Sequence, residues 1–172
     1  MDVTKDEKSM HSLHSTLRER IVEHLFVGEV LRWLWRRRVT DLEVLRSEFD
    51  AGGYDLMMSY KKIDRHIQLK VALDNGKVAG FKVSRKLMDK PSGCIIWIGV
   101  SQNLEIVNYR WLGGTPGEQF PDIPNLKNAK QSRGDSKGVK AKKPEHWIIP
   151  RAKFHKCNSI DEIMERLFGK LS

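Results

Sequence analysis

Cysteine is scarce in this sequence, and long apolar runs and the common nucleotide-binding and nucleophile motifs are missing. The two cysteines, Cys94 and Cys157, show no metal-binding spacing, which favours a reducing, cytoplasmic setting. No apolar run approaches the length of a membrane span, and the polar N-terminus MDVTKDEKSMHSLHS is not typical of a secretory signal. The glycine-rich stretch 113–117 lacks the lysine and hydroxyl residue of a phosphate-binding loop. The sequence therefore predicts neither a membrane protein nor a P-loop enzyme.

Positive charge is what the sequence has in excess. The 172 residues include 31 lysines and arginines against 22 aspartates and glutamates, a net charge of +9. The isoelectric point is about 9.6. Such a balance favours a polyanionic partner, most simply nucleic acid, although many basic proteins bind none. The length suits one domain with a sizeable core, which we place at residues 11–172 after a disordered segment 1–10.

Apolar spacing divides the first part of this domain into a helix and three strands. Residues 11–38 contain no proline and repeat apolar residues at helical intervals, which predicts one long, largely buried helix. Strands are expected at 42–48, 54–60 and 65–73, separated by turn signals. The third shows clean alternation, with Ile67, Leu69 and Val71 on one face.

The remaining elements complete a mixed architecture. Within residues 77–90 we expect a short strand or loop and then a helix through Val83 and Leu87. The continuous apolar run 94–100 predicts a central strand buried on both faces, followed by a strand at 104–112. Ser159 and Glu162 form a capping-box pattern that opens a C-terminal helix. This order predicts an α/β fold with a mixed central sheet flanked by helices.

Residues 113–146 differ in composition from both sides and are expected to form a long basic loop. Glycine and proline are frequent in its first half. Its second half carries seven basic residues against one acid: Lys127, Lys130, Arg133, Lys137, Lys140, Lys142 and Lys143. These residues are candidates for gripping a nucleic-acid backbone, and a solvated, mobile loop explains the same composition equally well.

Three polar residues of the second and third strands form the strongest chemical pattern. Gln68 and Lys70 are two apart, so they share a face, roughly 6–7 Å from each other along the strand. Asp55, at the start of the preceding strand, is brought beside them by an antiparallel hairpin. Asp55, the Gln68 amide oxygen and the Leu69 backbone carbonyl are the oxygen ligands that Mg²⁺ or Mn²⁺ prefers, and Lys70 is placed to serve an attacking water or a phosphate. A buried structural ion pair with an amide hydrogen bond is the alternative.

The sequence of Asp55, a hairpin and Gln68-Leu69-Lys70 resembles the motif of the PD-(D/E)XK nuclease superfamily, the restriction-endonuclease-like fold. The core of that family runs helix, three meandering strands, helix and strand (αβββαβ), the order expected here for residues 11–100. The resemblance implies that Asp55 and Gln68 bind the metal and that Lys70 assists the nucleophilic water. Asp55 follows glycine and tyrosine where the family has proline, and Gln68 stands where glutamate is commoner, as in both active and inactive members.

The family often adds an acid from the first helix or the first strand. Glu29 and Glu48 are the candidates. Glu29 lies among apolar residues at helical spacing, where an unpaired carboxylate is costly. It is therefore a site residue, the partner of an arginine, or a residue at the exposed edge of a broad apolar face. Glu48 either adds a ligand or solvates the glycine turn that follows it.

The function expected from these patterns is a metal-dependent nuclease that hydrolyses phosphodiester bonds, with DNA as the favoured substrate. Its cofactor would be Mg²⁺ or Mn²⁺, and a homodimer is compatible with cleavage of two strands. A catalytically inactive nucleic-acid-binding module on the same fold and a structural partner subunit are the alternatives. Gln68 keeps the inactive module open, because an amide is a weaker ligand than a carboxylate.

Overall fold

The computed structural model describes residues 10–49, 51–130 and 142–171. Of the segment expected to be disordered, residues 1–9 lie outside these ranges, and Met10 is helical. No helix in the described ranges is both long and apolar enough to span a bilayer.

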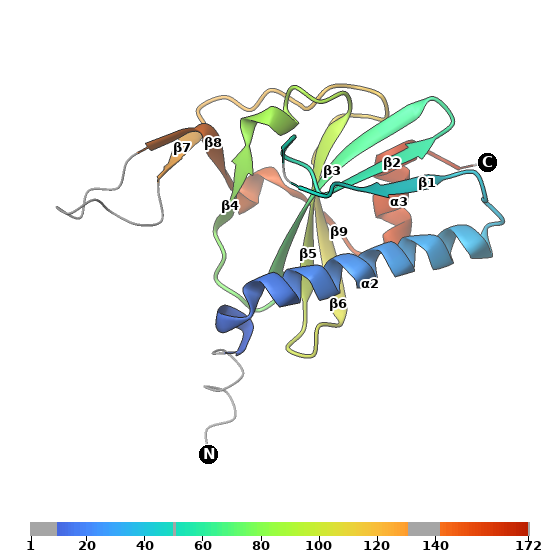
Figure 1. Cartoon of the computed structure of the whole chain (residues 1–172), viewed down its shortest axis with the longest axis horizontal. Helices are drawn as coiled ribbons and strands as arrows, with labels where there is room; N and C mark the ends of the chain where they lie inside the picture. The colour runs from blue at the N-terminus through green and yellow to red at the C-terminus, as the bar shows by residue number, and fades with distance from the viewer. Residues whose placement is uncertain (1–9, 50, 131–141, 172) are drawn as a thin grey trace, which may run out of the picture.

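A mixed sheet forms the centre of the molecule, as the sequence predicts (Figure 1). Its strands lie in the order β1-β2-β3-β5-β6-β9. The first three form an antiparallel meander, β3 and β5 are parallel, and β5, β6 and β9 are antiparallel again. The strands are β1 (Glu43–Arg46), β2 (Leu56–Tyr60), β3 (Ile63–Leu73), β5 (Gly93–Val100), β6 (Ile106–Gly113) and β9 (His155–Cys157). Every residue of β5 is buried, which confirms the prediction of a central strand covered on both faces.

Two helices cover one face of this sheet. The helix α2 (Ser15–Arg36) buries Val22, Phe26 and Val30 at intervals of four residues against the sheet. The helix α3 (Ile160–Phe168) packs into the same core, and its Asp161 accepts a 2.9 Å hydrogen bond from Trp33 of α2. The capping box at the start of α3 is confirmed, because Ser159 Oγ accepts a hydrogen bond from the Glu162 N–H at 3.3 Å.

A second, smaller sheet covers the opposite face, where helices were expected. Its strands β4 (Gly80–Ser84), β8 (Lys142–Pro150) and β7 (Lys127–Lys130) lie in the order β4-β8-β7. Val83 of β4 and Ile149 of β8 bury their side chains against Ile95, Trp97 and Leu112 of the main sheet. The protein therefore has a helical layer, a central sheet and a second sheet.

The prediction of a helix within residues 77–90 is wrong. The connection from β3 to β5 consists of β4 and a single 3₁₀ turn, η1 (Arg85–Leu87). The four-residue interval from Val83 to Leu87 imitates a helix, but Phe81 and Val83 both pack onto the sheet at the two-residue interval of a strand. Pairing with β8, which is distant in sequence, decides the outcome. The αβββαβ core therefore lacks its second helix, and the restriction-endonuclease-like form of the fold is not confirmed.

The segment expected to be a basic loop is partly strand. Residues 114–126 connect β6 to β7 without regular structure, as predicted, but residues 127–130 and 142–146 belong to β7 and β8. Ala129 is 1% exposed, and its burial accompanies the pairing of β7 with β8. Residues 131–141 lie outside the described part of the chain.

Candidate functional site

Asp55 lies where β2 stops pairing with β3. The register of these strands ends at the pair Leu56↔Ile67. One residue before it, the Asp55 N–H donates to the Ile67 carbonyl at 2.9 Å, and the Asp55 carbonyl accepts from the Ser47 N–H at 3.0 Å. The Asp55 carboxylate accepts the Leu69 N–H at 2.7 Å. We call this position, formed by Asp55 and residues 68–70, the β2–β3 fork.

The three residues singled out in the sequence meet at this fork, where Gln68 and Lys70 share one face of the sheet. Gln68 and Lys70 pair in register with Ile95 and Trp97, whose side chains lie under the second sheet. Asp55 lies one residue before β2, and its carboxylate reaches the N–H of Leu69, the residue between Gln68 and Lys70. The structure therefore brings the predicted carboxylate, amide and ammonium groups to one end of one hairpin.

The amide oxygen of Gln68 is an acceptor in need of a donor. Gln68 is 5% exposed, and its Oε1 accepts no hydrogen bond from any residue in the described ranges. Leaving such a buried oxygen unsatisfied costs about 1–3 kcal/mol, which a cation or a water molecule would relieve. Leu69 donates its N–H toward Asp55, and the carbonyl of a strand residue points to the same side as its N–H. The fork therefore contains three kinds of oxygen that can bind a metal: a carboxylate, an amide and a backbone carbonyl.

This donor set fits a hard divalent cation. Mg²⁺ is commonly held by one or two carboxylates and keeps several of its waters, so Asp55, the Gln68 amide and the Leu69 carbonyl are sufficient in kind. Within the described residues, no group of three or more histidine, cysteine, aspartate or glutamate side chains is arranged to hold a metal. The site is consequently poor in negative charge, as the amide at Gln68 implies.

The loop that carries Asp55 is held against the connection between β3 and β5. Gly53 has a φ of +76°, and a β-carbon there would lie 2.9 Å from Ser84 Cβ and 3.2 Å from the Leu87 backbone nitrogen. Only glycine avoids both the backbone strain and this contact. The turn η1 thus supports the fork although it is not the expected helix.

Glu48 lies on this same loop, one residue after Ser47. It is exposed and lines a shallow cavity of about 310 Å³ beside the fork. The cavity is bounded by Ser47, Glu48, Phe49, Ala51, Gly52, Tyr54 and Lys90. Glu48 is therefore placed on the segment that leads to Asp55, with a side chain accessible to solvent.

Glu29 is not brought to the fork. It lies on the helical side, where its carboxylate accepts a hydrogen bond from the hydroxyl of buried Tyr109 on β6. The strand β5 separates β6 from β3. Burial, followed by the hydrogen bond and charge of Glu29, raises the pKa of Tyr109 above its usual value. The partner of this carboxylate is thus a tyrosine, whereas the sequence suggested a metal, an arginine or an exposed position at the edge of the apolar face.

The buried acid that sequence reasoning missed is Glu23, also on α2. Glu23 is 6% exposed, and its two oxygens lie 3.0 Å from Arg20 Nη1 and 3.0 Å from Arg46 Nη1. The available signal was its position next to Val22 and four residues before Val27, both of which are buried. Arg46 ends β1, and the next residue, Ser47, pairs with Asp55. The ion pair between Glu23 and Arg46 therefore links α2 to the start of the loop that leads to Asp55.

The residues proposed to bind nucleic acid are only partly described. Lys127 and Lys130 are exposed on β7. Lys142 and Lys143 begin β8, where their backbones pair with Lys130 and Ala129. The other three candidates, Arg133, Lys137 and Lys140, lie outside the described residues.

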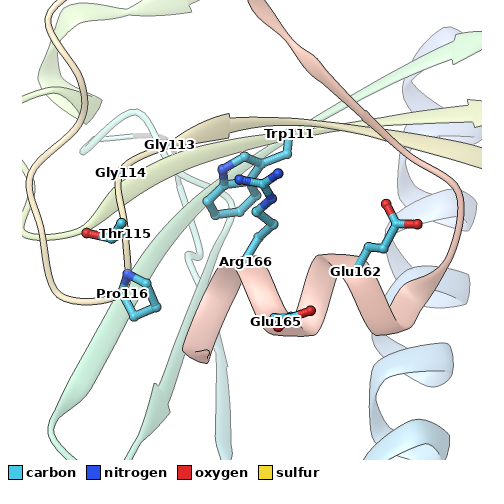
Figure 2. A pocket seen from close by; sticks show the side chains of 8 residues that line it. All are labelled: Trp111, Gly113, Gly114, Thr115, Pro116, Glu162, Glu165 and Arg166. Carbon is cyan, nitrogen blue, oxygen red and sulfur yellow. The ribbon is translucent and has the colours of Figure 1, made fainter. Parts of the chain in front are cut away.

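A separate cavity of about 480 Å³ opens between α3 and the segment after β6 (Figure 2). Trp111 lines it, with Thr115 and Pro116 on one side and Glu165 and Arg166 of α3 on the other. None of the residues of the fork lines this cavity, so it is not part of the candidate metal site.

Comparison with known proteins adds nothing to this geometry. The chain matches no protein-family model, and no curated protein resembles it closely enough to count as a match. The likeness to PD-(D/E)XK nucleases therefore rests on the motif at the fork and on the order of the first strands.

Proposed function

We propose that the protein is a metal-dependent nuclease that hydrolyses phosphodiester bonds, with DNA as the favoured substrate. The observation that carries this proposal is the fork itself. The Asp55 carboxylate is anchored on the Leu69 N–H at 2.7 Å, and the flanking Gln68 and Lys70 lie on the same face of the sheet. The unsatisfied amide oxygen of Gln68 supplies the second side-chain ligand.

Each residue of the fork has a defined role in this proposal. Asp55, the Gln68 amide and the Leu69 carbonyl hold Mg²⁺ or Mn²⁺. A metal bound there acidifies a coordinated water and offsets charge on a phosphate. The half-buried Lys70 orients or deprotonates the attacking water, or binds a phosphate oxygen. The net charge of +9 supports a polyanionic substrate.

The test is cleavage of plasmid and single-stranded DNA with Mg²⁺ or Mn²⁺. Asp55→Asn and Lys70→Ala should each lower the cleavage rate by about 10²-fold or more, because one removes a ligand charge and the other the ammonium that serves the water. Lys62→Ala is the matched control, since Lys62 is exposed in the turn between β2 and β3. Cleavage by Asp55→Asn and Lys70→Ala at the wild-type rate would show that these residues do not form the active site.

A non-catalytic nucleic-acid-binding module is the second candidate. It is favoured by the lack of a three-residue acid or histidine cluster among the described residues and by the amide at Gln68. Calorimetric titration with Mg²⁺ and Mn²⁺ separates the two. The module is identified if the protein binds DNA in a salt-dependent manner but shows no metal binding that is lost in Asp55→Asn. A structural subunit would bind no nucleic acid at physiological salt.

A further inference from the structure

A row of residues crosses the main sheet from the fork to its far edge. Lys70 of β3 pairs in register with Trp97 of β5, Trp97 with Arg110 of β6, and Arg110 with Lys156 of β9. Residues paired in register point to the same face of a sheet. Trp97 lies in the core beneath the second sheet, so all four residues belong to that face, the face of the proposed site.

Two arginines converge on the tryptophan of this row. The Cζ atoms of Arg110 and Arg151 lie 5.7 Å and 5.4 Å from the centroid of the Trp97 ring. Arg151 comes from η2 (Arg151–Lys153), directly after β8. The ring itself is fixed by Phe81 and Phe154, whose centroids lie 4.7 Å and 5.5 Å away. The two guanidinium groups are therefore supported by a rigid aromatic platform.

Neither arginine forms an ion pair with another described residue. No described carboxylate lies within salt-bridge distance of either guanidinium. Burial, and then the charge of Arg151, lower the pKa of Arg110, while the charge of Asp74 acts in the opposite direction. Asp74 itself is held by a hydrogen bond from the Asn108 amide. Two like charges brought together without an ion-pair partner in the described ranges form a natural site for an anion.

We infer that Arg110 and Arg151 bind a phosphate group of the nucleic acid that reaches the fork. The nature of the anion rests on the proposed function, since a polynucleotide substrate supplies a row of phosphates. With strands about 4.8 Å apart, the backbones of Lys70 and Arg110 are separated by roughly 10 Å. The arginines therefore bind a different phosphate from the one at Lys70, and exposed Lys156 lies beside Arg110 at the sheet edge.

The experiment measures binding of a fluorescently labelled oligonucleotide, single-stranded and duplex, in EDTA so that no cleavage occurs. The double variant Arg110→Gln/Arg151→Gln should bind about tenfold more weakly at low salt, and the slope of log K against log[NaCl] should fall by about 1–2. The matched control is Arg32→Gln/Arg36→Gln, which removes two exposed arginines from α2 on the opposite side of the sheet.

Folding is checked by cooperative thermal unfolding, and Arg110→Lys/Arg151→Lys keeps both charges if the glutamine variant fails to fold. The lysine variant should still bind more weakly than the wild type, because an ammonium cannot form the two-pronged contact of a guanidinium. The inference is overturned if a folded Arg110/Arg151 variant matches the control in affinity and slope, or if the wild type binds no oligonucleotide.

Cleavage assays separate this inference from the proposed function. A protein that binds DNA through these arginines but cleaves nothing supports the inference and overturns the nuclease. A protein that cleaves with an unchanged KM after loss of both arginines supports the nuclease and overturns the inference. An increased KM with unchanged kcat supports both, since the arginines contact a phosphate away from the bond that breaks.

Discussion

Gln68 and Asp55 show how far single residues could be predicted. Both residues could be singled out in the sequence, because they are polar residues in strands whose apolar residues recur at every second position. The acids on α2 were not assignable in the same way. Each residue of a helix is rotated by about 100° from the last, so Glu23 and Glu29, six residues apart, point in directions about 120° from each other, and the sequence does not show which strand each direction meets. The structure places Glu23 toward β1 and Glu29 toward β6.

Buried Cys94 and Tyr109 make the stability of the protein sensitive to alkaline pH. Burial raises the pKa of the Cys94 thiol to about 12 from a usual value of 9.0, and the pKa of Tyr109 is also raised. Between the unfolded and folded pKa values the native state holds protons that the unfolded chain has lost. The contribution of these groups to the free energy of unfolding is therefore fully present below about pH 9. It falls as the pH rises toward 12, by at most about 1.4 kcal/mol per pH unit for each group.

Urea unfolding at about pH 8 and about pH 10.5 measures this dependence. Cys94→Ala and Tyr109→Phe should each lose less stability over that interval than the wild type, even if they start lower. The matched control is Ile98→Val, a fully buried change without a titratable group, which should shift stability equally at both pH values. Identical pH dependence in the wild type and in Cys94→Ala would rule out a contribution from this thiol.

At the scale of elements, local patterns were sufficient where a segment's own residues decide its structure. The apolar run of β5, the alternation of β3 and the capping box of α3 all formed as expected. The strand β4 did not, because its conformation depends on pairing with β8, more than sixty residues later in the chain. A short segment with apolar residues at both two- and four-residue intervals is compatible with a helix and with a strand. Which of the two forms depends on whether another strand pairs with the segment.

The contact between the Asp55 loop and η1 leads to a prediction about two glycines. Gly53 and Gly117 both have positive φ, +76° and +86°, but only Gly53 lies against other atoms, since nothing is within 4 Å of a β-carbon at Gly117. Gly117→Ala should cost about 1 kcal/mol of strain, and Gly53→Ala at least about 2 kcal/mol, from strain and the contact with Ser84 and Leu87 together.

Chemical denaturation of the two variants gives the comparison directly. Gly53→Ala should also weaken the metal binding proposed for the fork, because a shift of this loop displaces Asp55 from the Leu69 N–H. Equal destabilisation by the two substitutions, with metal affinity unaffected, would mean that the loop is not held in place by η1.

At the scale of the whole molecule, the two faces of the central sheet carry different kinds of residues. The helical face buries the larger core, and Trp33 and Asp161 join its two helices. The face under the second sheet carries the fork and the row from Lys70 to Lys156. Replacing the expected crossover helix by β4 and η1 leaves the fork in place, because β2, β3 and the loop before Asp55 define it by their own hydrogen bonds.

The fork lies where three strands meet, so a metal bound there should stabilise the entire chain. Asp55 is joined through its backbone to Ser47 after β1 and to Ile67 of β3, and through its carboxylate to Leu69. Binding to the native state alone at a hundred times the dissociation constant adds about 2.7 kcal/mol, which for a chain of this size raises Tm by roughly 5–10 °C. Differential scanning calorimetry with Mn²⁺ should show this rise in the wild type and lose it in Asp55→Asn, while NaCl of equal ionic strength controls for screening. A similar rise in Asp55→Asn would place the metal elsewhere, because the substitution removes the charge of the fork but preserves its shape.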